Sequence, residues 1–513
     1  MAGDTESPDY ESSSIEIPTS YQHLPSQEEE DEGNLILTDA SKYAARRTLL
    51  NFALMSILFS ANHGCVSACL GLATARLGAT GAWQSGLLFL TYTLSAILGA
   101  TWIVKKLGAR NALWLGMTLY CVYVGCFWVA TRYDSSEEQR FAAYTGAAIG
   151  GIGAGFLWTS QGAYFAQASE EHAAHLQQAV SVSTSFLAGV FAFFYLAEEL
   201  LLRLLSTVLV GILSWESIFG LYTVIALASA FAMPIVYNYR GHDNGTASAL
   251  YKVTAATQLL WRDPKMKYMI GLNAVFGFAS AFLNSYVNGQ VVPVALHDLE
   301  GRYIGVLSSW VSALAAGMSL VFGQITPLIG GKGPILLLGS ICFVGVVLPF
   351  IIEPDAEKYG WGLLLLVYSF HGIGRATFEG TLKATFADYF PYEKEGAFAN
   401  IILQNGLAGA IGYVLTFSLL CEERSRYCIQ YSNGTLHDVL TFELIVVIAG
   451  GFAIFGYLRA SALFKGEQDA PHTNVDEGRE GEEPMFLSGA SRSDPPEDGD
   501  YFLARRDPPV TKQ

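Results

Sequence analysis

The stretch 372–383 places three charged residues inside an apolar segment of the chain. It reads GIGRATFEGTLK and continues the apolar run 361–370, so it is predicted to form part of a membrane-spanning helix. Arg375, Glu379 and Lys383 follow one another at intervals of four residues and therefore share one face of that helix. An ionisable group at bilayer depth costs roughly 2.5–3.5 kcal/mol on insertion scales. The charged face must therefore look into a protein interior or a water-filled cavity.

Apolar runs of about 20 residues recur along the sequence, and this pattern predicts a polytopic membrane protein. Only 15% of the 513 residues are charged, whereas soluble domains carry about 25%. We expect an all-α membrane protein with twelve transmembrane helices in two six-helix pseudo-repeats. The predicted spans are 48–72, 83–104, 111–131, 141–165, 178–202, 216–238, 267–290, 303–328, 334–353, 361–387, 397–420 and 438–459.

Two tails flank the membrane part and hold half of the 46 acidic residues. Both tails are rich in Ser, Pro and Gly, so they are predicted to be disordered and solvated. The first 46 residues lack the apolar segment of a cleavable signal peptide. The membrane part is nearly neutral, and nothing in it indicates nucleic-acid binding. The predicted parts are an acidic cytoplasmic tail at 1–46, an N-terminal six-helix bundle at 47–238, a cytoplasmic connection at 239–266, a C-terminal six-helix bundle at 267–460 and a second acidic cytoplasmic tail at 461–513.

The distribution of basic residues predicts the orientation of the spans. Lys and Arg are more numerous at the ends that flank the tails, so both termini are expected to be cytoplasmic. The loop 421–437 then lies on the outer or lumenal side, where Asn433 begins an Asn-Gly-Thr glycosylation acceptor. The same loop carries Cys421 and Cys428, which either form a disulfide in an oxidising compartment or remain two free thiols.

An internal repeat relates the two halves. Residues 151–166 read GIGAGFLWTSQGAYFA, and residues 372–387 read GIGRATFEGTLKATFA, at an offset of 221 residues. Predicted spans four and ten are therefore structural counterparts, as are spans two and eight. The positions of the three charged residues align with Ala154, Trp158 and Gly162. The charges thus belong to one half only.

These motifs resemble the major facilitator superfamily and, within it, the uncoordinated-ninety-three (Unc-type) family. Residues 151–164 are similar to that family's glycine-rich helix ending in Leu-Trp-x-x-Gln-Gly-x-Tyr, and residues 390–399 resemble its Phe-Pro-x-Glu-x-x-x-Ala-Phe-Ala turn. Lys105, Lys106 and Arg110 belong to a degenerate form of the superfamily's cytoplasmic gating loop, which here lacks its aspartate. The resemblance spans about 48–460 and leaves both tails unexplained.

The charged stretch has two interpretations, ligand binding and internal ion pairing. Arg375 presents a planar fork for a carboxylate or phosphate, and a desolvated Glu379 can carry a proton through a transport cycle. Alternatively, Arg375, Glu379 and Lys383 only pair with one another and lock the helix. The family resemblance implies Asp and Asn near the positions of Arg375 and Glu379, so the ligand of this chain is expected to differ.

Further candidates come from spans one, four, seven and ten, which the resemblance places around a central cavity. They are Asn62, His63, Trp158, Gln161, Asn284 and His371. The alternative for each is ordinary packing or a hydrogen bond between helices. Glu198 and Glu199 are expected at the outer end of span five, in contact with water.

Two functions remain open. The first is secondary transport of a small polar or anionic solute by alternating access, with Glu379 coupling a proton. The second, implied by the resemblance, is a non-transporting accessory protein that regulates or traffics a partner channel or receptor. No nucleophilic, metal-binding or dinucleotide-binding pattern is found, so neither an enzyme nor a cofactor is expected.

The N-terminal tail carries one motif that bears on localisation. Asp31, Leu35 and Ile36 fit an acidic dileucine signal that sorting adaptors recognise, and the alternative is an acidic solubilising tail. The expected location is therefore the plasma membrane or an endolysosomal or vacuolar membrane. The expected partners are a small solute, the lipid bilayer and, in the second function, a membrane protein.

Overall fold

The computed structural model describes residues 39–134, 136–239, 249–298, 300–326, 328–421, 428–430 and 436–469. The chain divides into two compact units, Met1–Lys465 and Gly466–Gln513. All the contacts reported below lie within the first unit. The predicted sorting residues Asp31, Leu35 and Ile36 and the predicted glycosylation site Asn433 fall outside the described residues.

The described residues form helices almost throughout, with one small hairpin. The elements are α2 (Asp39–Leu77), α3 (Ala79–Leu98), α4 (Ala100–Leu107), α5 (Ala109–Ala130), α6 (Glu137–Leu176), α7 (Val180–Leu209), α8 (Trp215–Ala232), the 3-10 turn η2 (Met233–Ile235), α9 (Ala249–Arg262), α10 (Pro264–Ala281), the π-helix η3 (Phe282–Val291), α11 (Val292–Ala295), α12 (Ile304–Ile325), α13 (Gly333–Ile352), the 3-10 turn η4 (Ala356–Lys358), α14 (Trp361–Ala376), the π-helix η5 (Thr377–Leu382), α15 (Lys383–Tyr389), α16 (Lys394–Ser418), β1 (Cys428–Gln430), β2 (Leu436–Asp438) and α17 (Leu440–Asp469).

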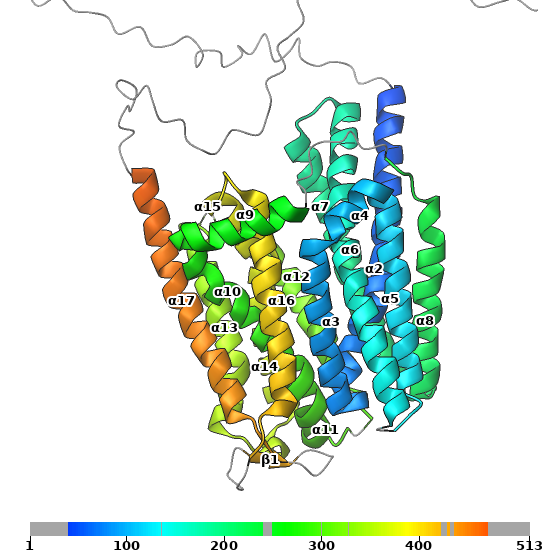
Figure 1. The fold of residues 1–513 in the computed structure, drawn as a ribbon, viewed down its shortest axis with the longest axis vertical. Coiled ribbons are helices and arrows are strands. Elements are labelled where there is room, and N and C mark those ends of the chain that lie inside the picture. Colours follow the sequence, from blue (N-terminus) through cyan, green and yellow to red (C-terminus); the bar gives the residue numbers. More distant parts are fainter. Residues whose placement is uncertain are drawn as a thin grey trace, which may run out of the picture. The chain divides into compact units, whose positions relative to one another are not determined.

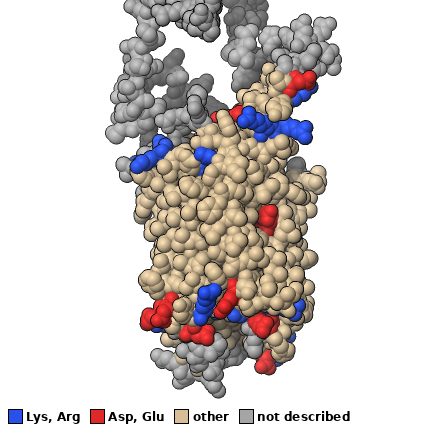
Figure 2. All heavy atoms as spheres, turned by 90° about the vertical axis from the view of Figure 1, so that its right-hand side faces the viewer, with Lys and Arg blue, Asp and Glu red and all other residues tan. Residues whose placement is uncertain are grey.

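The expectation of an all-α membrane protein is confirmed. Ten helices in the described part of the chain are long and apolar enough to cross a membrane. The helix α3 and the segment from α14 to α15 fall outside that set, so the number twelve stays a prediction. Figure 2 shows one face of the molecule, where charged side chains gather at the two ends and the wide band between them is almost free of charge. Such a band suits the hydrocarbon core of a bilayer.

The two ends of the bundle differ, and α9 and the β1–β2 hairpin mark them (Figure 1). We call them the α9 end and the hairpin end. The helix α9 occupies half of the predicted connection 239–266, where no span was predicted. It packs against α16 and also contacts α3 and α4, so it links helices from both halves of the sequence.

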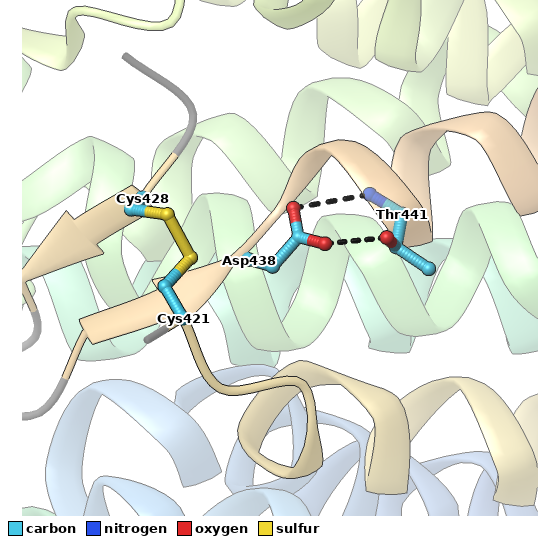
Figure 3. Close-up of a disulfide and its surroundings, with 4 residues drawn as sticks. All are labelled: Cys421, Cys428, Asp438 and Thr441. Atoms are coloured by element: carbon cyan, nitrogen blue, oxygen red, sulfur yellow. Dashed lines mark hydrogen bonds between the residues drawn. A yellow bond between two sulfur atoms is a disulfide. The ribbon is translucent and has the colours of Figure 1, made fainter. Parts of the chain in front are cut away.

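The hairpin closes over the start of α17. β1 and β2 pair antiparallel, with Ile429 opposite His437. Cys421 and Cys428 are joined by a disulfide, the first of the two alternatives left open by the sequence (Figure 3). Asp438 caps α17, since its carboxylate accepts hydrogen bonds from the amide and the hydroxyl of Thr441.

Close packing of glycines supports the internal repeat. Gly151 of α6 lies against α3, where a Cβ atom would collide with the carbonyl oxygen of Leu88. Gly372, its counterpart in α14, lies against α12, where a Cβ would be 3.0 Å from the carbonyl oxygen of Val311. Counterpart glycines therefore meet counterpart helices, as the offset of 221 residues predicts.

Contacts near the hairpin end join the helices α2–α8 to the helices α10–α17. Asn288 of η3 donates to the carbonyl oxygen of Gly71 in α2 (3.0 Å). Gly86 of α3 packs on Ala410 of α16, because a Cβ there would lie 3.2 Å from the Ala410 carbonyl oxygen. Nearer the α9 end, the side chains of Glu379 and Lys383 are about 40% exposed. The two halves are therefore in contact near the hairpin end, and the charged stretch is partly exposed nearer the α9 end.

Candidate functional site

Glu199 of α7 stands at the centre of the site. Its side chain is 1% exposed, and it receives two parallel hydrogen bonds from Arg375 of α14. The Arg375 Nη1–Glu199 Oε1 distance is 2.8 Å, and the Arg375 Nη2–Glu199 Oε2 distance is 2.9 Å. Bidentate pairing of this kind is among the strongest hydrogen-bonded contacts in proteins. It joins the N-terminal half of the chain to the C-terminal half.

A second guanidinium holds the same carboxylate. Arg203 follows one turn later on α7, and its Nη2 lies 2.7 Å from Glu199 Oε1. Its Nη1 donates to the carbonyl oxygen of Ser308 in α12 (3.0 Å). The hydroxyl of Ser312 also donates to Glu199 Oε1 (3.2 Å). One buried carboxylate thus faces two arginines, and three helices meet at it.

The charges continue towards the α9 end along α14, η5 and α15. Arg375 Nε lies 3.9 Å from Glu379 Oε1, and Lys383 Nζ lies 2.8 Å from Glu379 Oε2. The predicted shared face of these three residues is therefore present, and so is the internal pairing that the sequence left as an alternative. Glu379 lies in a π-helical turn, a feature that often marks functional sites in helices.

These five residues form a row of alternating sign that we call the charge ladder. From the α9 end to the hairpin end, its members are Lys383, Glu379, Arg375, Glu199 and Arg203. Three cations face two carboxylates, so the ladder carries one excess positive charge when every member is ionised. An unpaired charge in a buried site favours an anionic ligand.

The expectation that Glu199 is solvated is wrong. The helix α7 runs on to Leu209, which places Glu199 inside the bundle rather than at its outer end. The neighbouring Glu198 is half-buried and forms no ion pair among the described residues. The spacing of Glu199 and Arg203 within an apolar run was the available signal, since it matches the spacing of Arg375 and Glu379.

A cavity of about 150 Å³ adjoins the ladder. Four ladder residues line it, Glu199, Arg203, Arg375 and Glu379. Three predicted residues also line it, His63, Asn284 and His371. Tyr195, Ser280 and Tyr413 complete much of its polar surface, and sequence reasoning did not single them out.

The two histidines of the cavity each keep one ring nitrogen free. His63 Nε2 lies 3.1 Å from the Ser67 hydroxyl and 3.3 Å from the Tyr195 hydroxyl. His371 Nε2 lies 3.1 Å from the Ser280 hydroxyl. Among the described residues, neither Nδ1 atom has a hydrogen-bond partner, and neither does Nε of Arg203. Buried polar atoms without partners call for a ligand or water.

Three predicted residues lie outside the cavity lining. Asn62 is buried and donates to the carbonyl oxygens of Ala226 (3.0 Å) and Met117 (3.4 Å), so it ties α2 to α8 and α5. Trp158 packs edge-on against His63, with ring centroids 5.2 Å apart, and thereby supports the cavity wall from behind. Gln161 is partly exposed and is not brought to the cavity.

The predicted gating loop lies at the α9 end. Arg110 donates to the carbonyl oxygens of Pro234 (2.7 Å) and Val236 (3.4 Å), just after α8. Lys106 lies over the Trp102 ring, 4.8 Å from its centroid, and Lys105 is exposed. These contacts stay within the N-terminal half of the chain, so the role of the loop in gating stays a prediction.

Comparisons with known proteins agree with this geometry. The family model of the Major Facilitator Superfamily matches residues 48–413. The chain is 21% identical to Protein unc-93 homolog A of Bos taurus over 396 residues. This alignment covers 69% of this chain and 80% of the relative. It is 23% identical over 349 residues to UNC93-like protein 3 of Arabidopsis thaliana, covering 64% of this chain and 72% of the relative.

Solved structures show the same fold. The nucleoside transporter NupG aligns with a TM-score of 0.58 at 12% identity, over 82% of this chain and 99% of NupG. The xylose transporter XylE from E. coli, in a partially occluded inward open conformation, aligns with a TM-score of 0.55 at 15% identity, over 82% of this chain and 98% of XylE.

Proposed function

Since this chain belongs to the Major Facilitator Superfamily, we propose that it is a secondary transporter that moves a small anionic solute across a membrane by alternating access. The observation that carries the proposal is the charge ladder beside the central cavity, with its one excess positive charge. The cavity has room for roughly five water molecules, which suits a small solute. The superfamily is one of transporters rather than enzymes.

The ladder suggests how the solute acts on the fold. The Glu199 carboxylate accepts two hydrogen bonds from the guanidinium of Arg375, as the carboxylate of a solute would. A solute anion that binds Arg375 or Arg203 competes with Glu199 and weakens the link between the two halves. The hairpin end can then open while the solute keeps the arginines neutralised. This exchange avoids an unpaired buried charge at each step.

Glu379 is the proposed site of proton coupling. Its side chain is about 40% exposed and lies on the α9 side of Arg375, and protons would reach it from water at that end. Protonation would remove its ion pair with Lys383 and its weaker contact with Arg375. Arg375 would then carry more uncompensated charge and hold an anion more tightly. Proton and anion would therefore bind together, as in a symporter.

Uptake into proteoliposomes tests the transport proposal. The probes are radiolabelled short-chain monocarboxylates and inorganic phosphate, with a pH-sensitive dye inside the vesicles. Arg375→Ala should lower uptake of the transported probe by about 10-fold to 100-fold, because a charge-assisted hydrogen bond contributes about 1.5–3 kcal/mol. Glu379→Gln should retain binding but lose its response to a pH gradient.

The matched control is Glu198→Gln, next to Glu199 but outside the ladder, and it should transport normally. Normal flux in both Arg375→Ala and Glu379→Gln would remove these residues from the mechanism. If no probe is moved and the protein instead copurifies with a membrane protein in fixed ratio, the non-transporting accessory function replaces this proposal.

The orientation follows as a second proposal. We infer that the α9 end faces the cytoplasm with both termini, and that the hairpin end faces the outside or a lumen. The Cys421–Cys428 disulfide supports an oxidising compartment at the hairpin end. Glycosylation at Asn433 should therefore be detectable as an enzyme-sensitive mass shift that Asn433→Gln removes.

The predicted sorting signal of the N-terminal tail has its own test. Replacing Leu35 and Ile36 by alanine should move a fluorescent fusion from endolysosomal membranes to the cell surface, whereas an unchanged location contradicts the sorting signal.

A further inference from the structure

A second cavity lies at the α9 end, on the outside of the bundle between α2, α6 and α7. It has a volume of about 450 Å³. We call it the α2–α7 groove. The residues that carry the argument are Lys42, Arg46 and Leu49 of α2, Leu176 of α6, and Val182 and Phe186 of α7. None of them belongs to the charge ladder or to the central cavity.

The walls of the groove are apolar and uncovered. The side chains of Val182 and Phe186 are 54% and 49% exposed. Two polar side chains of the walls are already hydrogen-bonded within the protein, since His172 Nδ1 and Gln178 Nε2 each lie 2.8 Å from the Ser183 hydroxyl. The walls therefore offer an apolar ligand a surface but offer a polar ligand little to bind.

The rim of the groove is basic. Lys42 and Arg46 are one helical turn apart on α2, so both side chains lie over the same groove. Within the described ranges neither forms an ion pair, and no acidic side chain lines the groove. Asp39 lies three residues before Lys42 on α2 but is not within ion-pair distance of it, and Glu171 of α6 lies 3.6 Å from His175 Nε2. The rim thus has two cations that form no ion pair among the described residues.

The depth of the groove suits the surface of a bilayer. The apolar run of α2 begins near residue 48, so Lys42 and Arg46 precede it by less than two turns. Basic side chains at this depth meet lipid headgroups, while the residues below them meet acyl chains. Figure 2 shows Lys and Arg side chains, with a few acidic ones, at this end of the face, above the band that is almost free of charge.

We propose that the α2–α7 groove binds one anionic phospholipid. Lys42 and Arg46 bind the phosphate and the acidic headgroup, and an acyl chain runs along Leu49, Val182 and Phe186. A soluble phosphate would use the rim but leave the apolar wall uncovered, and a zwitterionic lipid would use the wall but not the excess charge. An anionic lipid matches both surfaces at once.

The site has a consequence for the fold, because α7 also carries Glu199 and Arg203. A lipid seated between α2 and α7 holds the α9 end of α7 against α2. It therefore stabilises the arrangement in which α7 reaches across to α14 through Glu199. The lipid proposal does not depend on which solute, if any, the central cavity takes.

The test measures lipid binding to the full-length protein in detergent by native mass spectrometry. Delipidated protein is titrated with phosphatidylserine, with phosphatidylcholine and with soluble glycerophosphoserine. We expect one phosphatidylserine to bind at least about tenfold more tightly than phosphatidylcholine. The double variant K42A/R46A should lose about thirtyfold in affinity for phosphatidylserine, because two basic contacts to the headgroup are removed.

Two further variants distinguish lipid binding in the groove from binding to other basic residues at this end and from binding of the phosphate group alone. K105A/K106A removes an exposed basic pair at the same end but outside the groove, and it should bind phosphatidylserine like the native chain. Phe186→Ser should weaken phosphatidylserine binding but leave that of glycerophosphoserine unchanged. Equal affinity for the two lipids overturns the proposal, and so does an equal loss in K105A/K106A. Glycerophosphoserine binding as tight as the lipid's would make this a phosphate site and would also overturn it.

Discussion

Replacing Glu199 by alanine should lower the free energy of unfolding by about 3–5 kcal/mol, the range for breaking a buried ion pair. The substitution leaves the guanidinium groups of Arg203 and Arg375 in a buried site without their shared carboxylate. It also removes the bidentate contact between α7 and α14. The measurement is the unfolding transition of purified protein in detergent, followed by the signal of buried aromatic residues.

Glu198→Ala is the matched control, because it removes the same side chain one position earlier on the same helix. Glu198 is half-buried and has no ion pair among the described residues, so we expect a change of no more than about 0.5 kcal/mol. Small anions should raise the unfolding temperature of Glu199→Ala more than that of the native protein, since they find both arginines free. Equal losses in the two variants would contradict the central position of Glu199.

Gly151→Ala should destabilise the protein by about 3 kcal/mol, at the upper end of the range for overpacking. A Cβ at Gly151 would collide with the Leu88 carbonyl oxygen and the Thr91 hydroxyl, and it would lie 2.9 Å from the Tyr92 amide nitrogen. Because two of these atoms belong to a helix backbone, α6 must move away from α3. The same unfolding measurement reports the effect.

Gly162→Ala on the same helix controls for helix propensity. A Cβ at Gly162 meets nothing within 4 Å. Exchanging glycine for alanine in a helix interior is favourable by about 1 kcal/mol on propensity alone. The control should therefore be neutral or slightly stabilised, and the difference between the two variants isolates the contact with α3. Two equally stable variants would contradict the close packing of α6 against α3 at Gly151.

Local pattern was enough to predict the membrane class, the repeat and part of the site. An apolar run that contains Arg375 and Glu379 has few physical solutions, and pairing at four-residue intervals is one of them. The glycines at 151 and 372 could be matched because a repeat preserves spacing along the chain. The charge spacing and each copy of the glycine motif lie within about one helix length, so they can be recognised without knowledge of the tertiary structure.

The parts of the site that the sequence did not predict depend on contacts between distant segments of the chain. Glu199 and Arg375 are 176 residues apart, and no sequence pattern near either residue indicates which residue it pairs with. Asn62 shows the converse case, since its position in span one suggested a residue of the cavity, whereas its side chain donates a hydrogen bond to Ala226. The helix α9 was missed because it lies across the end of the bundle and lacks the long apolar run that marks a span.

The unequal number of cations and carboxylates in the ladder makes the proposed carrier sensitive to membrane voltage. With Glu379 ionised, the empty site holds one positive charge. A proton on Glu379 together with a bound monoanion leaves that charge unchanged. A charge that crosses the full field gains or loses about 2.3 kcal/mol per 100 mV. Voltage therefore favours one orientation of the site, empty or loaded, whereas a complete cycle moves no net charge. Symport of one proton with one monoanion should thus change its rate with voltage but generate no steady current, and a steady current would show that the anion moves without the proton.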